Sequence, residues 1–206
     1  MTAGIADTAQ ARQSDVCTLL CAFANTFDVE DGSDALADPA GLTAWLSTYG
    51  LLDQPATAGP ADVQLARRLR DGVRQAMAQH HDGDVETAIP DLDEAARALP
   101  LRTTFDGTRP RLVPSITGVR AGLARVLVAI IEAQTAGAWI RLKLCGADDC
   151  AWAYYDTSKN RSRLWCSMEV CGNRQKTRAY RARRRASQRN SDGQPAADGE
   201  AARMGR

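Results

Sequence analysis

Six cysteines are the residues of this 206-residue chain with the clearest chemical potential. Four of them form two close pairs, Cys145-x4-Cys150 and Cys166-x4-Cys171, with fifteen residues between the pairs. This spacing is typical of a tetrahedral structural zinc site, because each short loop delivers two thiolates and the long loop folds back with the second pair. Four thiolates leave no open position on the metal. We therefore expect one Zn²⁺ per chain, held for structure rather than catalysis.

Two other interpretations of these cysteines stay open. They could be ordinary buried thiols or a disulfide-based redox switch, and a redox role could coexist with zinc because oxidation would release the metal. The surroundings favour the metal. Gly146 would permit the backbone turn at the first pair, and the free amides of a helix starting after Cys171 would stabilise thiolate charge.

A strongly basic run, GNRQKTRAYRARRRASQR, follows Cys171 and predicts a helix to about Ser187. Steps of four, three and four place four arginines in one stripe along it. Such like charges repel one another, and a polyanion would relieve that repulsion through phosphate contacts and counterion release. The candidate nucleic-acid-binding residues in this run are Arg174, Lys176, Arg178, Arg181, Arg183, Arg184 and Arg185. The alternatives are a solvated basic face, or a tail that docks on the protein's own acidic part.

Charge is unevenly distributed behind a net value of +1. Residues 141–189 carry thirteen Lys or Arg against four Asp or Glu, whereas the rest of the chain has thirteen basic and twenty-one acidic residues. An acidic body joined to a basic end indicates two parts with different partners.

The remaining sequence predicts a mostly helical body that positions these residues. Apolar spacing and capping or breaking residues indicate helices over 14–27, 42–49, 63–77, 91–99 and 117–136, with Ser14 or Asp15 capping the first and Asp91 the fourth. A buried strand followed by a turn is the alternative for 14–27. Asp106-Gly107 between two extended stretches predicts a hairpin over 101–114. Alternation from Ile140 to Leu144 and the segment 151–155 predict two short strands beside the cysteines. The expected fold class is α+β and mostly α, with a small treble-clef-like zinc module of two strands and the basic helix.

Polar and sulfur-containing side chains in the N-terminal part have less specific signals. Asn25 and Thr26 follow an apolar run and could line a ligand cavity, or cap a helix and satisfy a turn. Cys17 and Cys21 share one helix face and could join His80 and His81 in a second metal site, or be buried apolar thiols. His80 and His81 could equally supply favourable charge at a helix C-terminus.

Several function classes are disfavoured. No apolar run approaches the ~20 residues that span a bilayer, and the first residues lack the pattern of a signal peptide, so we expect a cytoplasmic protein without membrane attachment. Phosphate-binding glycine loops, Ser-x-x-Lys and paired catalytic carboxylates are missing from the sequence. We therefore do not expect an enzyme.

The C-terminal motif resembles the CGNR zinc-finger family. The resemblance rests on the four cysteines with Trp152, Tyr155, Asp156, Ser158, Asn160, Arg163, Trp165 and the Cys171-Gly172-Asn173-Arg174 signature, over about forty-five residues. It implies that the four cysteines bind zinc and that Asn173, Arg174, Lys176 and Arg178 occupy the signature turn and first helical turns. Trp152, Tyr155 and Trp165 would form a small core around the metal. Ala151 departs from the pattern, where the family often has glycine.

The N-terminal part resembles, more loosely, the ABATE domain that usually precedes this finger, through Phe23 to Thr26, Leu42-x-x-Trp45-Leu46 and the helix from Leu65 to Leu69. The family is described as stress-induced transcription regulators. We expect a flexible N-terminus (1–12), an effector domain (13–136), the zinc finger with its basic helix (139–187) and a disordered tail (188–206).

Together these features predict a bacterial, zinc-dependent regulator that binds double-stranded DNA. Its N-terminal domain would respond to stress or to a small-molecule effector, and a homodimer is a natural expectation for palindromic sites. The alternatives are an RNA-binding zinc knuckle that stacks bases on Tyr154 and Tyr155, or an interaction module that contacts the transcription machinery.

Overall fold

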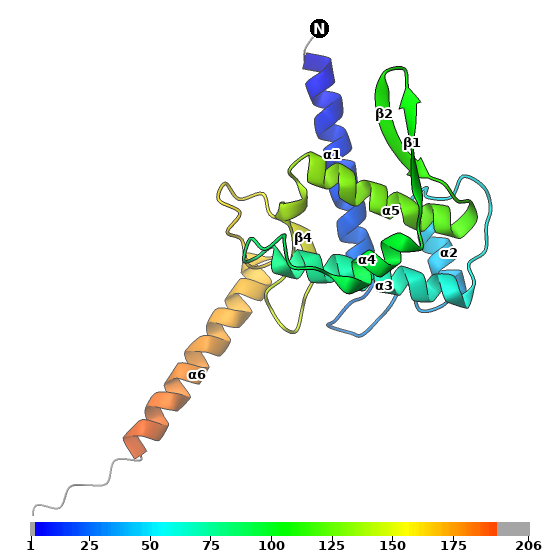
Figure 1. Cartoon of the computed structure of the whole chain (residues 1–206). Coiled ribbons are helices and arrows are strands. Elements are labelled where there is room, and N and C mark those ends of the chain that lie inside the picture. The colour runs from blue at the N-terminus through cyan, green and yellow to red at the C-terminus, as the bar shows by residue number, and fades with distance from the viewer. Residues whose placement is uncertain (1–2, 193–206) are drawn as a thin grey trace, which may run out of the picture. The chain divides into compact units, whose positions relative to one another are not determined.

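The computed structural model describes the backbone of residues 3–192 and the side chains of residues 13–188. Figure 1 shows its helices and the β1–β2 hairpin, coloured in chain order. A second antiparallel hairpin is formed by β3 and β4. The elements are α1 (Ala3–Ala24), α2 (Pro39–Thr48), α3 (Pro60–Gln79), α4 (Pro90–Arg97), β1 (Leu101–Asp106), β2 (Arg109–Pro114), α5 (Gly118–Thr135), β3 (Leu142–Leu144), β4 (Ala153–Tyr155) and α6 (Asn173–Asp192). The predicted fold class, mostly helical with two hairpins and a cysteine cluster, is confirmed.

The chain divides into two compact units. The first ends at Cys166 and contains α1 to α5, both hairpins and the loop after β4. The second begins at Ser167 and contains a single π-helical turn, Met168–Gly172, that leads into α6. The division falls inside the second cysteine pair.

The core of the first unit is formed by α1, α3 and α5, which contact one another (Figure 1). Leu20, Phe23, Leu69, Val73 and Leu123 are completely buried there. The apolar spacings seen in the sequence therefore mark the packed faces of these helices. Gly72 brings α3 and α4 together, because a Cβ at this position would lie 2.8 Å from the backbone nitrogen of Leu92.

Helix α1 begins earlier than predicted. The sequence indicated a helix capped at Ser14 or Asp15 after a flexible segment 1–12, whereas the structure is helical from Ala3. After Gly4 this segment contains no glycine or proline and is rich in Ala, Gln and Arg, which favour helix. At the other end of the chain, α6 continues to Asp192, past the predicted Ser187, and the rest of the expected tail lies outside the described residues.

Two predicted boundaries were wrong for local reasons. Helix α4 has Ile89 as its N-cap rather than Asp91, because Pro90 supplies the fixed φ suited to the first helical position. The strand expected from Ile140 begins at Leu142, since Trp139–Arg141 forms a 3₁₀ turn whose Trp139 is buried. The β1–β2 hairpin is confirmed, with Gly107 in its turn at φ +62°.

Candidate metal centre and basic helix

The four paired cysteines come together. Cys145 follows β3, Cys150 precedes β4, Cys166 ends the loop after β4, and Cys171 lies in the turn before α6. Their sulfur atoms all lie within 4.8 Å of one another, and three of the four residues are buried. The Sγ atoms of Cys150 and Cys166 are 3.7 Å apart.

This donor set fits a structural zinc ion. With Zn–S bonds of about 2.3 Å, the sulfurs of a tetrahedral site lie about 3.8 Å apart, close to the Cys150–Cys166 separation. Four thiolates also exclude solvent and substrate from the metal, so zinc here would tie the chain segments together without supplying catalysis. The prediction of one zinc site at Cys145, Cys150, Cys166 and Cys171 is confirmed.

The first cysteine loop contains a residue in an unusual conformation. The amides of Cys150 and Ala151 both donate to the carbonyl of Ala147, at 2.9 and 3.1 Å. This turn places Ala151 at φ +48°, a region where a Cβ is unfavourable and glycine is preferred. Arg74 of α3 donates from Nη2 to the Ala151 carbonyl at 3.1 Å and so helps hold the strained residue.

Gly146 has a different role from the one the sequence suggested. It does not adopt a positive φ in the structure. A Cβ there would lie 3.2 Å from the Leu164 carbonyl and 3.4 Å from the Trp165 ring, and the Gly146 amide donates to that same carbonyl at 2.9 Å. The glycine therefore allows the loop carrying Cys166 to approach the first loop closely.

A buried ion pair organises the segment between the cysteine pairs. Lys143 of β3 and Asp156 are both almost fully buried, with Nζ 3.0 Å from Oδ2. The Asp156 carboxylate also accepts from the amides of Ser158 and Arg163, and Lys143 donates to the Arg161 carbonyl. Burial by itself raises the pKa of Asp156, but hydrogen bonds from Ser158, Lys143 and Arg163 outweigh it and lower that pKa to about 2. The carboxylate is therefore ionised at neutral pH and fixes the loop.

Arg163 supports the third ligand directly. Its guanidinium donates to the carbonyls of Trp165 and Cys166 and lies 5.0 Å from the centre of the Tyr154 ring. The Tyr154 hydroxyl in turn donates to the Arg163 carbonyl. Tyr154 is buried by these contacts and cannot stack on a nucleic-acid base, which removes one of the two rings invoked for RNA binding.

The aromatic residues do not all pack as the resemblance implied. Trp165 lies against Gly146, and Tyr155 packs on the hydrophobic core of the first unit. Trp152 is 41% exposed and lines a surface pocket. The expected three-residue core around the metal is therefore wrong for Trp152, which precedes β4 and lies at the surface, whereas the first residue of the strand, Ala153, is buried.

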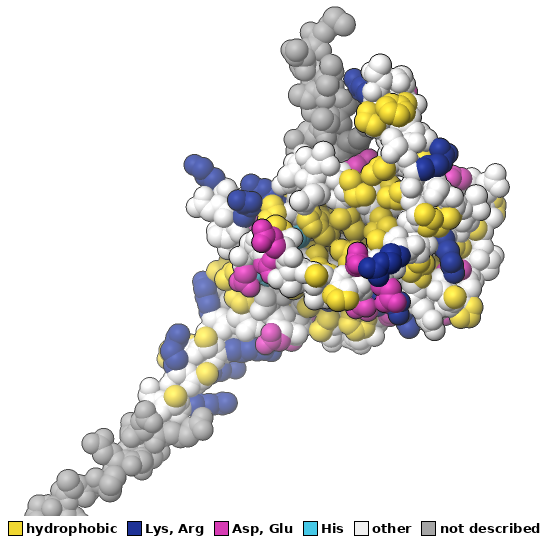
Figure 2. All heavy atoms as spheres, in the orientation of Figure 1, with side chains coloured by type: hydrophobic (Ala, Val, Ile, Leu, Met, Phe, Trp, Pro, Cys, Tyr) yellow, Lys and Arg dark blue, Asp and Glu magenta, His cyan; other side chains and the backbone are white. Residues whose placement is uncertain are grey.

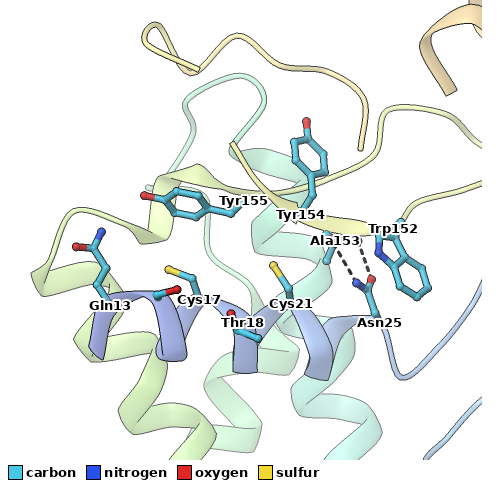
Figure 3. Close-up of a pocket in the computed structure, with 10 residues that line it drawn as sticks. Gln13, Cys17, Thr18, Cys21, Asn25, Trp152, Ala153, Tyr154 and Tyr155 are labelled. Carbon is cyan, nitrogen blue, oxygen red and sulfur yellow. Dashed lines mark hydrogen bonds between the residues drawn. The ribbon is translucent and has the colours of Figure 1, made fainter. Parts of the chain in front are cut away.

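The polar pair Asn25-Thr26 divides between two environments. Asn25 lines the same pocket as Trp152, and its side-chain amide donates to the Ala153 carbonyl at 3.0 Å and accepts from the Ala153 amide at 2.7 Å (Figure 3). Thr26 is buried, donates to the Phe23 carbonyl at 2.7 Å and accepts from Arg70. Of the two, only Asn25 is among the residues that line this pocket.

His80 and His81 anchor the metal hairpin instead of binding metal. The Nδ1 of His80 is 2.7 Å from the Leu142 carbonyl, and the Nε2 of His81 is 2.5 Å from the Leu144 carbonyl. Within the described residues, the only cluster of three or more His, Cys, Asp or Glu side chains that could hold a metal is the four-cysteine cluster, so the alternative of a second site that joins Cys17 and Cys21 to His80 and His81 is contradicted. Burial lowers the pKa of His80, which therefore adds no positive charge at the end of α3.

The basic helix starts within two residues of the fourth ligand. Ser167 caps the turn by accepting from the Val170 amide at 3.3 Å, and Asn173 begins α6 while its side chain donates to the Glu169 carbonyl. Lys176, Arg178, Arg181 and the run Arg183 to Arg185 are exposed. Figure 2 shows Lys and Arg side chains in dark blue along this helix. Arg174 differs, since its Nη2 lies 3.6 Å from the Cys171 sulfur and it is only partly exposed.

Sequence reasoning missed the contacts that hold the metal loops. Arg74 and Lys143 were not singled out, and Arg163 and Asp156 were named only as part of a motif, yet each fixes backbone near a cysteine. The alternation Leu142-Lys143-Leu144 was the available signal, because a charged residue in a strand with both faces covered needs a buried partner.

Comparisons with known families agree with this geometry. A family described as "putative stress-induced transcription regulator" (ABATE) matches residues 18–141, and the CGNR zinc finger matches residues 141–184. Comparison with curated proteins gave no match. Neither matched family is a family of enzymes. Among the described helices, none is both long and apolar enough to cross a membrane. The chain therefore belongs to the ABATE family and carries a CGNR zinc finger that binds one zinc ion.

Proposed function

We propose that this protein is a cytoplasmic, zinc-dependent transcription regulator that binds double-stranded DNA through α6. The observation that carries the proposal is the exposed run of basic side chains on a helix that starts directly after a zinc ligand. The described part of α6 from Asn173 to Gln188 contains seven Lys or Arg and no Asp or Glu. Such a helix is self-repelling until an anion covers it.

Phosphates of a duplex provide the matching charge. Basic side chains on phosphates release condensed counterions, and this release supplies most of the non-specific affinity for DNA. Arginine can also form bidentate bonds with guanine in the major groove, which admits an α-helix. Zinc contributes by fixing the turn from which the helix starts, so that the basic side chains are presented from a defined origin.

Arg174 has a separate task in this proposal. Its guanidinium lies against the Cys171 sulfur, where a positive charge stabilises a thiolate. We assign it to the metal centre, and assign DNA contacts to Asn173, Lys176, Arg178, Arg181, Arg183, Arg184 and Arg185, which are all exposed. The N-terminal domain would carry the response to stress or to a small effector. Homodimerisation would match palindromic target sites.

The test is selection from fragmented bacterial genomic DNA at near-physiological salt, followed by sequencing of the bound fragments. We expect enrichment of a shared motif by the zinc-loaded protein, and its loss in Cys166→Ser. Competition with duplex RNA and single-stranded RNA of equal length separates the nucleic acids. Stronger displacement by RNA, or binding that survives nuclease treatment, would overturn the proposal in favour of an RNA or a protein partner.

A further inference from the structure

A pocket of about 400 Å³ lies between α1 and β4. Figure 3 shows Cys17 and Cys21 on α1 with their sulfur atoms directed toward the strand that carries Tyr154 and Tyr155. Ser14, Thr18 and Trp152 are exposed parts of the lining, whereas Cys17 is only 6% exposed. The zinc centre uses neither thiol. Two thiols therefore line one surface pocket that is partly open to solvent.

The spacing of this dithiol disfavours a direct disulfide. Residues four apart on a helix have Cβ atoms about 5–6 Å apart, whereas a disulfide needs about 3.8 Å. Closing that gap would unwind α1, whose Phe23 and Leu20 are buried in the core. One additional atom between the two sulfurs would span the gap without moving the helix.

The protonation state of Cys17 and Cys21 limits which kind of atom can bridge their two sulfurs. Burial raises the pKa of Cys17, and burial with Cys17 close by raises the pKa of Cys21 to about 12. Both groups are therefore neutral thiols at neutral pH. Zinc would require two thiolates and two further ligands here, and the Asn25 side chain is already hydrogen-bonded to Ala153. A reagent that forms an uncharged product with two neutral thiols fits Cys17 and Cys21 better than zinc does.

We propose that Cys17 and Cys21 form a binding site for trivalent arsenicals. In the reaction with R–As=O, two As–S bonds form while both S–H bonds and the As=O bond break. The oxygen leaves with both protons as water, arsenic stays in the +3 state, and the product is uncharged. Trp152 and Tyr155 line the remaining space, which accommodates a substituent of phenyl size.

Asn25 connects this site to the β3–β4 hairpin, which lies beside the zinc ligands. Asn25 lies one helical turn beyond Cys21, and its amide donates to the Cys21 carbonyl at 2.9 Å. The Asn25 side chain holds Ala153, three residues after the zinc ligand Cys150. An arsenical bound between α1 and β4 would therefore act on the hairpin. This inference deepens the effector role in the proposed function, but its test does not depend on DNA.

The test uses zinc-loaded full-length protein and phenylarsine oxide, with native mass spectrometry as the readout. We expect one adduct per chain, with the mass of the reagent less one water, and full retention of zinc. Cys17→Ser and Cys21→Ser should each lose the adduct, because a single thiol cannot chelate arsenic. Thr18→Ala, which changes the lining but not the thiols, should keep it.

Peptide mapping of the wild-type adduct covers the case in which a serine variant folds poorly. Trypsin releases residues 13–67 as one peptide, which contains Cys17 and Cys21 and none of the other four cysteines. The adduct should be found on that peptide. An adduct on the zinc-binding cysteines with loss of zinc, an equal adduct in the double serine variant, or no adduct on zinc-loaded wild type would each overturn the proposal.

Discussion

The side-chain amide of Asn25 forms two hydrogen bonds with the main chain of Ala153, one as donor and one as acceptor. Asn25 begins the turn after α1, and Ala153 begins β4, three residues after the zinc ligand Cys150. Arg74, His80 and His81 make similar bonds from α3 and its C-terminal end to Ala151, Leu142 and Leu144. Side chains of the ABATE domain therefore hold the backbone of the hairpin that carries the first cysteine pair.

Loss of the Asn25 contacts should weaken the first unit. In Asn25→Ala, the Ala153 N–H and C=O lose their side-chain partners in a partly buried site, so we expect a decrease of about 2 kcal/mol in the free energy of unfolding. Urea denaturation followed by circular dichroism measures it. Asn160→Ala makes the same change at an exposed loop position and should have little effect. Equal stability of the two variants would contradict the contribution assigned to Asn25.

Replacing Ala151 by glycine should stabilise the protein. Ala151 has φ +48°, where glycine avoids the clash of the Cβ, so Ala151→Gly should raise the free energy of unfolding by about 1 kcal/mol. Ala44→Gly is the matched control, because Ala44 is exposed in α2 and the same substitution there should destabilise by about 1 kcal/mol. Thermal unfolding of the two variants should shift in opposite directions.

His80 should make stability depend on pH. Burial lowers its pKa below the ordinary value of 6.5, so the unfolded chain takes up a proton first as the pH falls. The stabilisation is thus complete above about pH 6.5 and is lost as the pH falls toward the lower folded-state pKa. We expect the free energy of unfolding to fall between pH 7 and 5.5, and to fall less steeply in His80→Gln. His81→Gln, which leaves the buried ring in place, should lose stability more steeply than His80→Gln over the same range.

Cysteine substitutions should lower the zinc content only when they remove a ligand of the four-cysteine cluster. Cys166→Ser should purify with less than a tenth of the wild-type zinc, because three thiolates do not close the coordination sphere. Cys17→Ser should retain about one zinc per chain, since Cys17 is no ligand of the four-cysteine cluster. Elemental analysis of protein purified without added metal checks both, and equal zinc in the two variants would contradict the ligand assignment.

The exposed arginines of α6 should set the salt dependence of DNA binding. Each phosphate contact contributes about 0.9 to the slope of log K against log salt, so Arg178→Ala and Arg181→Ala should each reduce that slope by about 1. Arg109→Ala removes an exposed charge from the β1–β2 hairpin and serves as the control. Titration of a fluorescent duplex over a series of salt concentrations gives the slopes, and an unchanged slope in both α6 variants would exclude α6 as the contact.

Local patterns in the sequence were sufficient to predict the helices, the hairpins and the metal ligands. The period of Val119, Leu123 and Val126 predicted α5, Asp106-Gly107 predicted the first hairpin, and the cysteine spacing identified the zinc site. Each of these features depends on residues that are close together in the sequence. Helix propensity, turn chemistry and loop length are therefore enough to predict them. The start of α1 and the cap of α4 were wrong because weak propensities and Pro90 decide such boundaries.

The sequence by itself therefore determined the mostly helical body, the four zinc ligands and the basic composition of α6. Only the tertiary structure decided that Asn25 holds Ala153, that Lys143 pairs with Asp156 and that His80 is a buried anchor. These pairs lie 128, 13 and 62 residues apart for Asn25–Ala153, Lys143–Asp156 and His80–Leu142. A polar residue that becomes buried needs a hydrogen-bonding or charged partner. The identity of that partner depends on how the helices pack, and no local sequence pattern encodes it.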